Sequence, residues 1–144
     1  MSAGEFHNKV VVVTGAASGL GRATAFAFAA EGARLVLADV DAAGLEATTA
    51  KVQEMGGKAI AAPTDLSDVG ACSALAPKAV ESFGQLDVVC NVAGAFRFDH
   101  ATAITPEIWD RIHGVNVRGP FFVIQSALPY LIQSAGSVVN VASA

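Results

Sequence analysis

The fold of this chain is decided by one stretch, Thr14-Gly15-Ala16-Ala17-Ser18-Gly19-Leu20-Gly21. It follows four consecutive valines, which predict a buried strand. It leads into an alanine-rich segment at 20–31 that is almost free of charge and predicts a buried helix. A strand that turns on glycines into a helix leaves backbone N–H groups pointing at one spot, where the helix dipole adds about half a positive charge. The stretch therefore predicts a phosphate-binding turn.

The three glycines of this turn are expected to have separate roles. Gly15 lets the chain leave the strand in a conformation that a side chain disfavours, Gly19 lets the backbone approach a pyrophosphate, and Gly21 permits close packing of helix on strand. The spacing Gly-x-x-x-Gly-x-Gly differs from the Gly-x-Gly-x-x-Gly of most dinucleotide-binding folds. Alone, such a turn is also compatible with a plain strand-to-helix connection, so the remaining motifs decide between the two interpretations.

Composition restricts the possible classes of protein. The chain has 144 residues, enough for one domain, with 53% hydrophobic and only 15% charged residues. A chain with so few charged residues is expected to bury most of its surface, either in a sheet that is covered on both faces or in a contact between subunits. The net charge of −4 argues against a nucleic-acid partner. The sequence contains no membrane-spanning apolar run, and residues 1–9 do not resemble a signal peptide, so we expect no membrane association and a cytoplasmic location.

Metal-binding residues do not cluster in the sequence. Cys72 and Cys90 lack the paired spacing of a zinc site, and His7, His100 and His113 are scattered. We expect no metal site and interpret the two cysteines as reduced thiols of the core.

Strand and helix patterns alternate along the chain with short connections. This alternation predicts an α/β fold, a doubly wound parallel sheet within three α/β/α layers. The strands are expected at 9–14, 34–39, 58–64, 87–92 and 137–142, the last of them buried. The helices are expected at 20–31, from the cap Asp41 to Gly56, from Ser67 to Gly84, and from Thr105 to about Ile132.

A carboxylate ends the second expected strand. Asp39 lies where a dinucleotide fold places the group that accepts both hydroxyls of the adenosine ribose. Its charge would repel the extra phosphate of NADP, and neither Ser18 nor Val40 is a basic residue that would offset the repulsion. NAD is therefore the expected cofactor. The alternative is that Asp39 only caps the strand, which its coincidence with the glycine turn disfavours.

The ends of the third and fourth expected strands carry further candidates. Asp65 and Leu66 follow the third strand, near the expected position of an adenine, although Asp65 is also an ordinary start signal for a helix. Asn91, Ala93 and Gly94 follow the fourth strand, where small residues let the backbone approach a cofactor and an amide can tie the turn to its neighbours. A simple turn at the strand end is the alternative.

Two residues later in the chain are candidates for catalysis. Pro120 cannot donate a hydrogen bond to the carbonyl of Asn116, so that carbonyl is expected to be free to hold an ordered water, with an exposed amide beside it. The alternative is a proline kink without a function. Ser143 follows the fifth strand, and ligands of open parallel sheets bind beyond the carboxyl ends of the strands.

Taken together, these motifs resemble the short-chain dehydrogenase/reductase family in its NAD-preferring form, in the family's order and over nearly the whole chain. The resemblance implies a Rossmann fold that stops after the fifth strand, with residues 1–144 as a single NAD(P)-binding domain. Val92 departs from a frequent second asparagine of the family. The residues that it implies for cofactor binding are Gly15, Ser18, Gly19, Leu20, Gly21, Asp39, Asp65, Leu66, Asn91, Ala93 and Gly94.

The resemblance also implies an enzyme, an oxidoreductase that transfers hydride between NAD(H) and a small alcohol or ketone. Ser143 matches the serine that hydrogen-bonds the substrate oxygen, and Asn116 matches the asparagine whose carbonyl holds a water of the proton relay. The family's catalytic tyrosine and lysine are expected beyond Ala144. Tyr130 is followed four positions later by Ser134 instead of lysine, so residues 1–144 alone are expected to be inactive.

The end of the sequence leaves two interpretations. We favour a piece of a full-length dehydrogenase, itself expected to be a homodimer or homotetramer, because the last strand would otherwise have an unpaired apolar edge. The alternative is a truncated, noncatalytic nucleotide-binding or interaction module. A methyltransferase is disfavoured because it has no use for Asn116 or Ser143. The substrate stays open, since Phe96, Arg97 and Phe98 either line its site or form a solvated loop.

Overall fold

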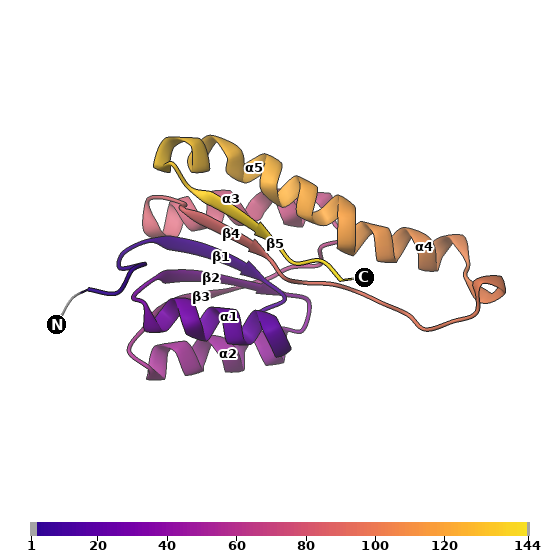
Figure 1. Cartoon of the computed structure of the whole chain (residues 1–144), viewed down its shortest axis with the longest axis horizontal. Helices are drawn as coiled ribbons and strands as arrows, with labels where there is room; N and C mark the ends of the chain where they lie inside the picture. Colours follow the sequence, from indigo (N-terminus) through magenta and orange to yellow (C-terminus); the bar gives the residue numbers. More distant parts are fainter. Residues whose placement is uncertain (1–2, 144) are drawn as a thin grey trace.

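Five parallel strands form one sheet in the computed structural model, which describes residues 3–143. Their spatial order is β3-β2-β1-β4-β5, so the chain winds outward from β1 in both directions (Figure 1). The strands are β1 (Val10–Thr14), β2 (Arg34–Asp39), β3 (Lys58–Pro63), β4 (Val88–Asn91) and β5 (Ser137–Asn140). The doubly wound parallel sheet expected from the sequence is confirmed.

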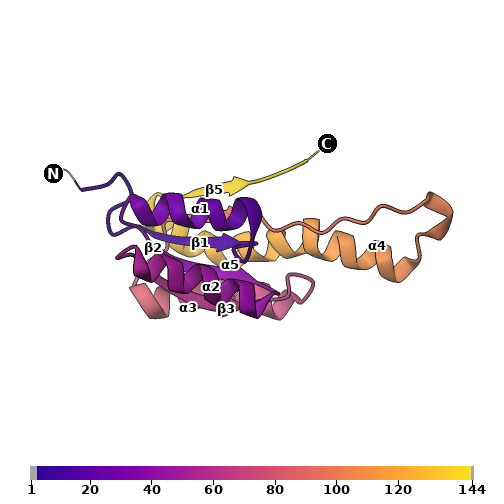
Figure 2. The same ribbon diagram turned by 90° about the horizontal axis from the view of Figure 1, so that it is seen from below.

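Helices cover the sheet on both faces, which gives the expected three layers. Figure 1 shows α1 and α2 on one side of the sheet, with α3 and α5 on the other. The helices are α1 (Gly19–Ala30), α2 (Ala42–Glu54), α3 (Val69–Phe83), the 3₁₀-helix η1 (Ala101–Ala103), α4 (Pro106–His113), the π-helix η2 (Gly114–Arg118) and α5 (Gly119–Ser134). Figure 2 shows α4 and the segment that precedes it projecting beyond the end of the sheet. Within residues 3–143, the helices are all too short or too polar to cross a bilayer.

The valine run of β1 supplies the centre of the core. Val10 and Val12 belong to the cluster under α3 and α5, whereas Val11 and Val13 belong to the cluster under α1 and α2. Successive side chains of a strand point to opposite faces, and a strand buried on both faces needs apolar residues at every position. All four valines are fully buried.

Side-chain caps mark where α2, α3 and α4 begin, and that of α4 is Thr105, as expected. The Asp41 side chain accepts a hydrogen bond from the Gly44 N–H, as expected for the cap of α2. The third helix begins at Val69 with Asp68 as its cap, and not at Ser67 as the sequence predicted. The Asp65 carboxylate accepts bonds from both the backbone N–H and the hydroxyl of Ser67, which holds residues 65–67 in a turn before the helix begins.

The fourth expected helix is divided into α4, η2 and α5. Within the π-helical turn the N–H of Gly119 donates to the carbonyl of Gly114, five residues earlier. The next residue, Pro120, has no N–H with which to continue a regular α-helical ladder. The sequence therefore located the irregularity correctly, although it did not predict the wider turn.

Two burial predictions were wrong. The fifth strand was expected to be buried, but Val139 is 49% exposed because β5 pairs only with β4 and lies at the edge of the sheet among the described residues. The first helix was expected to be buried, but only Gly21 and Ala25 are fully so. The other alanines of α1 lie on its outer side or at its margin, because a helix on the face of a sheet buries one stripe only.

Candidate functional site

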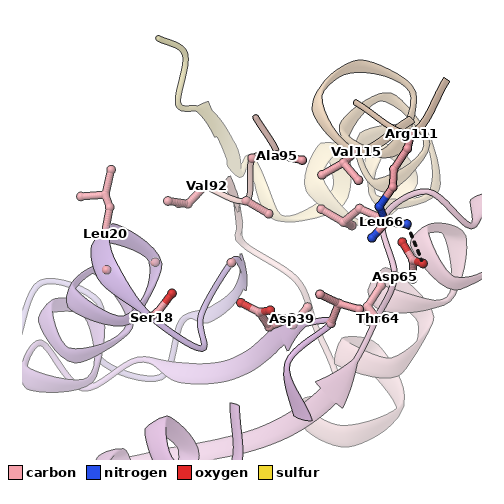
Figure 3. Close-up of a pocket in the computed structure, with 17 residues that line it drawn as sticks. Ser18, Leu20, Asp39, Thr64, Asp65, Leu66, Val92, Ala95, Arg111 and Val115 are labelled. Atoms are coloured by element: carbon pink, nitrogen blue, oxygen red, sulfur yellow. Dashed lines mark ion pairs between the residues drawn. The ribbon is translucent and has the colours of Figure 1, made fainter. Parts of the chain in front are cut away.

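A cleft of about 350 Å³ opens at the carboxyl ends of the strands (Figure 3). It lies where the direction of winding changes at β1, the usual position of ligands in open α/β sheets. Ten of the eleven residues expected to bind a cofactor line it. The full lining is Gly15, Ser18, Gly19, Leu20, Gly21, Ala38, Asp39, Val40, Thr64, Asp65, Leu66, Val92, Ala93, Gly94, Ala95, Arg111 and Val115.

The glycine turn forms one end of the cleft. Gly15 has a φ of +71°, and a Cβ placed there would lie 2.8 Å from the backbone of Ala93. Gly19 has a φ of +52°, and a Cβ on it would meet no atom within 4 Å, so its backbone faces open space. A Cβ on Gly21 would lie 2.0 Å from the carbonyl oxygen of Gly15, so the helix packs on the turn itself. The side chain of Ser18 makes no capping bond to α1, which leaves the first amides of this helix available to an anion.

Asp39 is held against this turn by two backbone hydrogen bonds. Its Oδ2 accepts from the Ala17 N–H and its Oδ1 accepts from the Asp41 N–H, both at 3.0 Å. The nearby Arg22 is engaged elsewhere, because its guanidinium donates to the Ala17 carbonyl and to the Thr48 hydroxyl. A carboxylate fixed in this way presents a negative charge and free lone pairs to the middle of the cleft.

Asp65 and Leu66 form the other end of the cleft, together with Arg111 and Val115. The Asp65 Oδ1 accepts hydrogen bonds from the Ser67 hydroxyl at 2.7 Å and the Ser67 N–H at 2.9 Å, and Arg111 Nη1 lies 3.7 Å from Asp65 Oδ2. The bonds from Ser67, followed by the charge of Arg111, lower the pKa of the Asp65 carboxyl below its usual value. Asp65 is therefore ionised at neutral pH.

Thr14 joins the ends of the two central strands. Its side chain is buried, and its Oγ1 accepts hydrogen bonds from the Val92 N–H at 3.1 Å and the Ala93 N–H at 3.2 Å. These bonds place the residues that follow β4 directly beside Gly15. The sequence included Thr14 in the decisive stretch but gave it no role, because its partner is 78 positions away.

Asn91 is the one expected cofactor residue that does not line the cleft. It is 3% exposed, and its Nδ2 donates to the Asn140 Oδ1 at 2.9 Å, across the pairing of β4 with β5. The expectation that its amide ties the turn to a neighbour is met by this bond. The expectation of cofactor contact receives no support from its position, because the side chain is buried, is bonded to Asn140 and does not line the cleft.

Asn116 lies in the π-helical turn beside the cleft. Its Oδ1 accepts from the Ala95 N–H and its Nδ2 donates to the Ala95 carbonyl, both at 2.7 Å. The residue is exposed, as expected, and its side-chain amide also holds the segment that follows Gly94. The sequence could not predict this contact, because the partner lies in an irregular segment 21 residues earlier.

Neither Ser143, the remaining candidate, nor Tyr130 lines the cleft. Ser143 is exposed, lies beyond the end of β5 and is not among the cleft-lining residues. Tyr130 lines a different cavity with Lys9 and Asp87, at the amino ends of β1 and β4. The carboxyl ends of the strands and Tyr130 therefore lie at opposite edges of the sheet.

Seven lining residues were not among the cofactor-binding residues predicted from the sequence, namely Ala38, Val40, Thr64, Val92, Ala95, Arg111 and Val115. Thr64 directly precedes the predicted Asp65, whereas Arg111 and Val115 come from α4 and η2. The four-residue spacing of Arg111 and Val115 places them on one helix face, next to the predicted Asn116. This spacing is the signal that would have identified them.

Comparisons with known proteins agree with this geometry. The model of a family described as short chain dehydrogenase matches residues 9–144. The chain is 38% identical over 138 residues to the meso-2,3-butanediol dehydrogenase of Serratia marcescens, covering 96% of this chain and 54% of that protein. It spans about half the length of the curated relatives it matches.

Solved structures are similar to it throughout. A short chain dehydrogenase/reductase from Burkholderia phymatum in complex with NAD is 36% identical, with a TM-score of 0.92 over 96% of this chain and 50% of that one. A metagenomic short-chain oxidoreductase in complex with NADP is 32% identical, also with a TM-score of 0.92, over 96% of this chain and 64% of that one.

Proposed function

The chain belongs to the short-chain dehydrogenase family, and we propose that its cleft holds NAD(H). We propose that the whole protein is an oxidoreductase that transfers hydride between NAD(H) and a small alcohol or ketone. Residues 1–144 would then be a single NAD(P)-binding domain.

The observation that carries this proposal is the meeting of the glycine turn and Asp39 in one cleft. The open backbone at Gly19 and the uncapped amides of α1 suit the pyrophosphate. The Asp39 carboxylate suits the hydroxyls of a ribose, and the end of the cleft at Asp65 and Leu66 suits the adenine. Ala93 and Gly94 supply the small residues that allow close approach on the side of β4.

The choice of NAD over NADP rests on charge. Asp39 would repel a phosphate on the ribose, and Arg111 is the only Lys or Arg among the residues that line the cleft. Arg111 belongs to the end of the cleft at Asp65, where it pairs with that carboxylate. Asp39 itself receives only backbone hydrogen bonds.

For the reaction, the bound nicotinamide supplies or accepts the hydride. We propose that Asn116, fixed by its two bonds to Ala95, presents its backbone carbonyl for a water of the proton relay, and that Ser143 hydrogen-bonds the substrate oxygen. Proton transfer needs a group of suitable acidity within reach of that oxygen. Tyr130 lines a cavity at the opposite edge of the sheet and has no lysine four residues later, so we expect residues 1–144 alone to be inactive.

The test is a fluorescence titration of the chain with NADH and NADPH. We expect NADH to bind at least about ten times more tightly than NADPH, because a carboxylate beside a phosphate costs more than about 1.4 kcal/mol. Asp39→Ala should weaken the binding of NADH and reduce the difference in affinity between NADH and NADPH. Asp99→Ala, which removes an exposed partner of Arg97 outside the cleft, is the control and should change neither affinity. Equal binding of both cofactors by the wild type would refute the proposed preference, and binding of neither would refute the cofactor site.

A further inference from the structure

Arg111 has a position that its single ion pair does not explain. It extends from α4, a helix without a fully buried residue, to the Asp65 carboxylate in the connection between β3 and α3 (Figure 3). Its Nη1 lies 3.7 Å from Asp65 Oδ2, and both side chains are partly exposed. An exposed pair of this kind contributes at most about 1 kcal/mol to stability. Attachment of α4 is therefore a weak reason for an arginine at the wall of the cleft.

The surroundings of Arg111 orient its guanidinium. Ser67 occupies the Oδ1 of Asp65 with two hydrogen bonds, so Oδ2 is the oxygen that faces Arg111. Leu66 and Val115 line the same end of the cleft, from the β3–α3 connection and from η2. Two apolar side chains and a planar cation form a wall suited to a flat heterocycle, because guanidinium groups interact favourably with the faces of aromatic rings.

The order of groups along the cleft identifies the part of the ligand that would meet Arg111. Figure 3 shows Ser18 and Leu20 at one end, Asp39 between, and Asp65 with Arg111 at the other end. A dinucleotide with its pyrophosphate at the glycine turn and its ribose at Asp39 has its purine at the end of Asp65. We infer that Arg111 is a binding residue for this purine, through contact of its guanidinium with the ring. The inference rests on the proposed NAD(H) site.

The experiment compares ligands with and without the purine. NADH and ADP-ribose carry the adenine, whereas reduced nicotinamide mononucleotide lacks it. We expect Arg111→Ala to weaken binding of NADH and ADP-ribose by roughly three- to tenfold, the range of a partly exposed cation–π contact. The affinity for reduced nicotinamide mononucleotide should stay the same. Arg111→Lys keeps the positive charge but lacks the planar guanidinium, so its affinity for NADH and ADP-ribose should also be lower than that of the wild type.

Lys51→Ala is the matched control, because it also breaks an exposed ion pair, with Glu54 of α2, outside the cleft. It should leave all three affinities unchanged. Unchanged or tighter NADH binding by Arg111→Ala would overturn the inference, as would full recovery by Arg111→Lys. An equal loss for reduced nicotinamide mononucleotide would also overturn it, since the effect would not belong to the purine. If the wild-type chain binds neither NADH nor ADP-ribose, the proposed cofactor site itself fails.

Discussion

A side chain introduced at Gly15 would destabilise the fold in two separate ways, through backbone strain and through steric overlap. Its φ of +71° belongs to the left-handed region, which costs an L-residue about 1–2 kcal/mol. A Cβ would also lie 2.8 Å from the Cα and the N of Ala93, and both are backbone atoms that cannot rotate away. This glycine therefore sets the distance between the turn after β1 and the segment after β4.

We expect Gly15→Ala to lower the free energy of unfolding by about 2–4 kcal/mol, as the sum of backbone strain and overpacking. Urea denaturation followed by circular dichroism measures the change. Gly56→Ala is the matched control, because Gly56 has a φ of +83° but a Cβ there meets no atom within 4 Å. It should show only the strain, about 1 kcal/mol. Equal losses in the two variants would mean that the contact with Ala93 relaxes without cost.

At the scale of the elements, the carboxyl ends of β1 and β4 depend on one hydroxyl group. We expect Thr14→Val to destabilise the fold by about 1–3 kcal/mol, because it leaves the partly buried N–H groups of Val92 and Ala93 without their acceptor. Hydrogen exchange of these two amides should accelerate. Thr49→Val is the control, since this buried hydroxyl only donates to the Leu45 carbonyl within α2, and it should cost under about 1 kcal/mol. Unchanged exchange at Val92 in Thr14→Val would show that another acceptor takes over.

Much of the element order was predictable because its signals are local. The expected limits of the second strand match β2, Arg34–Asp39. Those of the first and third strands differ from the structure by one residue at one end, and those of the fourth strand by one residue at each end. The positions of the strands can be predicted because each is an apolar run bounded by glycines or charged residues. The residues of the glycine turn, Asp39 and Asp65 were predictable for the same reason, because each directly follows a strand.

What could not be predicted depends on contacts between distant segments. The roles of Thr14 and Arg111, the clamp between Asn116 and Ala95, and the turn of Ser67 on Asp65 before α3 all follow from where elements meet in space. The exposure of β5 is of the same kind, because a strand's sequence gives its apolar character but not its number of neighbours. Local sequence patterns thus predict the glycine turn, Asp39 and Asp65 of the cleft. The position of Arg111 at the Asp65 end depends on tertiary packing.

In the molecule as a whole, each of the two cysteines lies in the hydrophobic cluster on a different face of the sheet, so their thiols can be used to follow the two clusters separately. Cys72 packs in the cluster under α3 and α5, and Cys90 packs in the cluster under α1 and α2. Burial raises the pKa of each thiol to about 11, and the charges of Asp68 and Asp65 add to the effect at Cys72. Because the pKa of each thiol is raised in the folded protein, the contribution of the protonated thiols to stability is complete below about pH 9, the ordinary thiol pKa. It is lost as the pH rises through about 11.

We therefore expect neither thiol to react with a disulfide reagent at pH 8 until the chain unfolds, since the reactive thiolate is scarce and both sulfurs are buried. If residues 1–144 form a single cooperative domain, Cys72 and Cys90 should become reactive at the same urea concentration, which should also be the midpoint of the change in circular dichroism. Cys72→Ala and Cys90→Ala, each leaving one thiol, assign the two signals. Exposure of one thiol at a clearly lower urea concentration would show that one helical layer separates before the sheet unfolds, and would contradict the single domain.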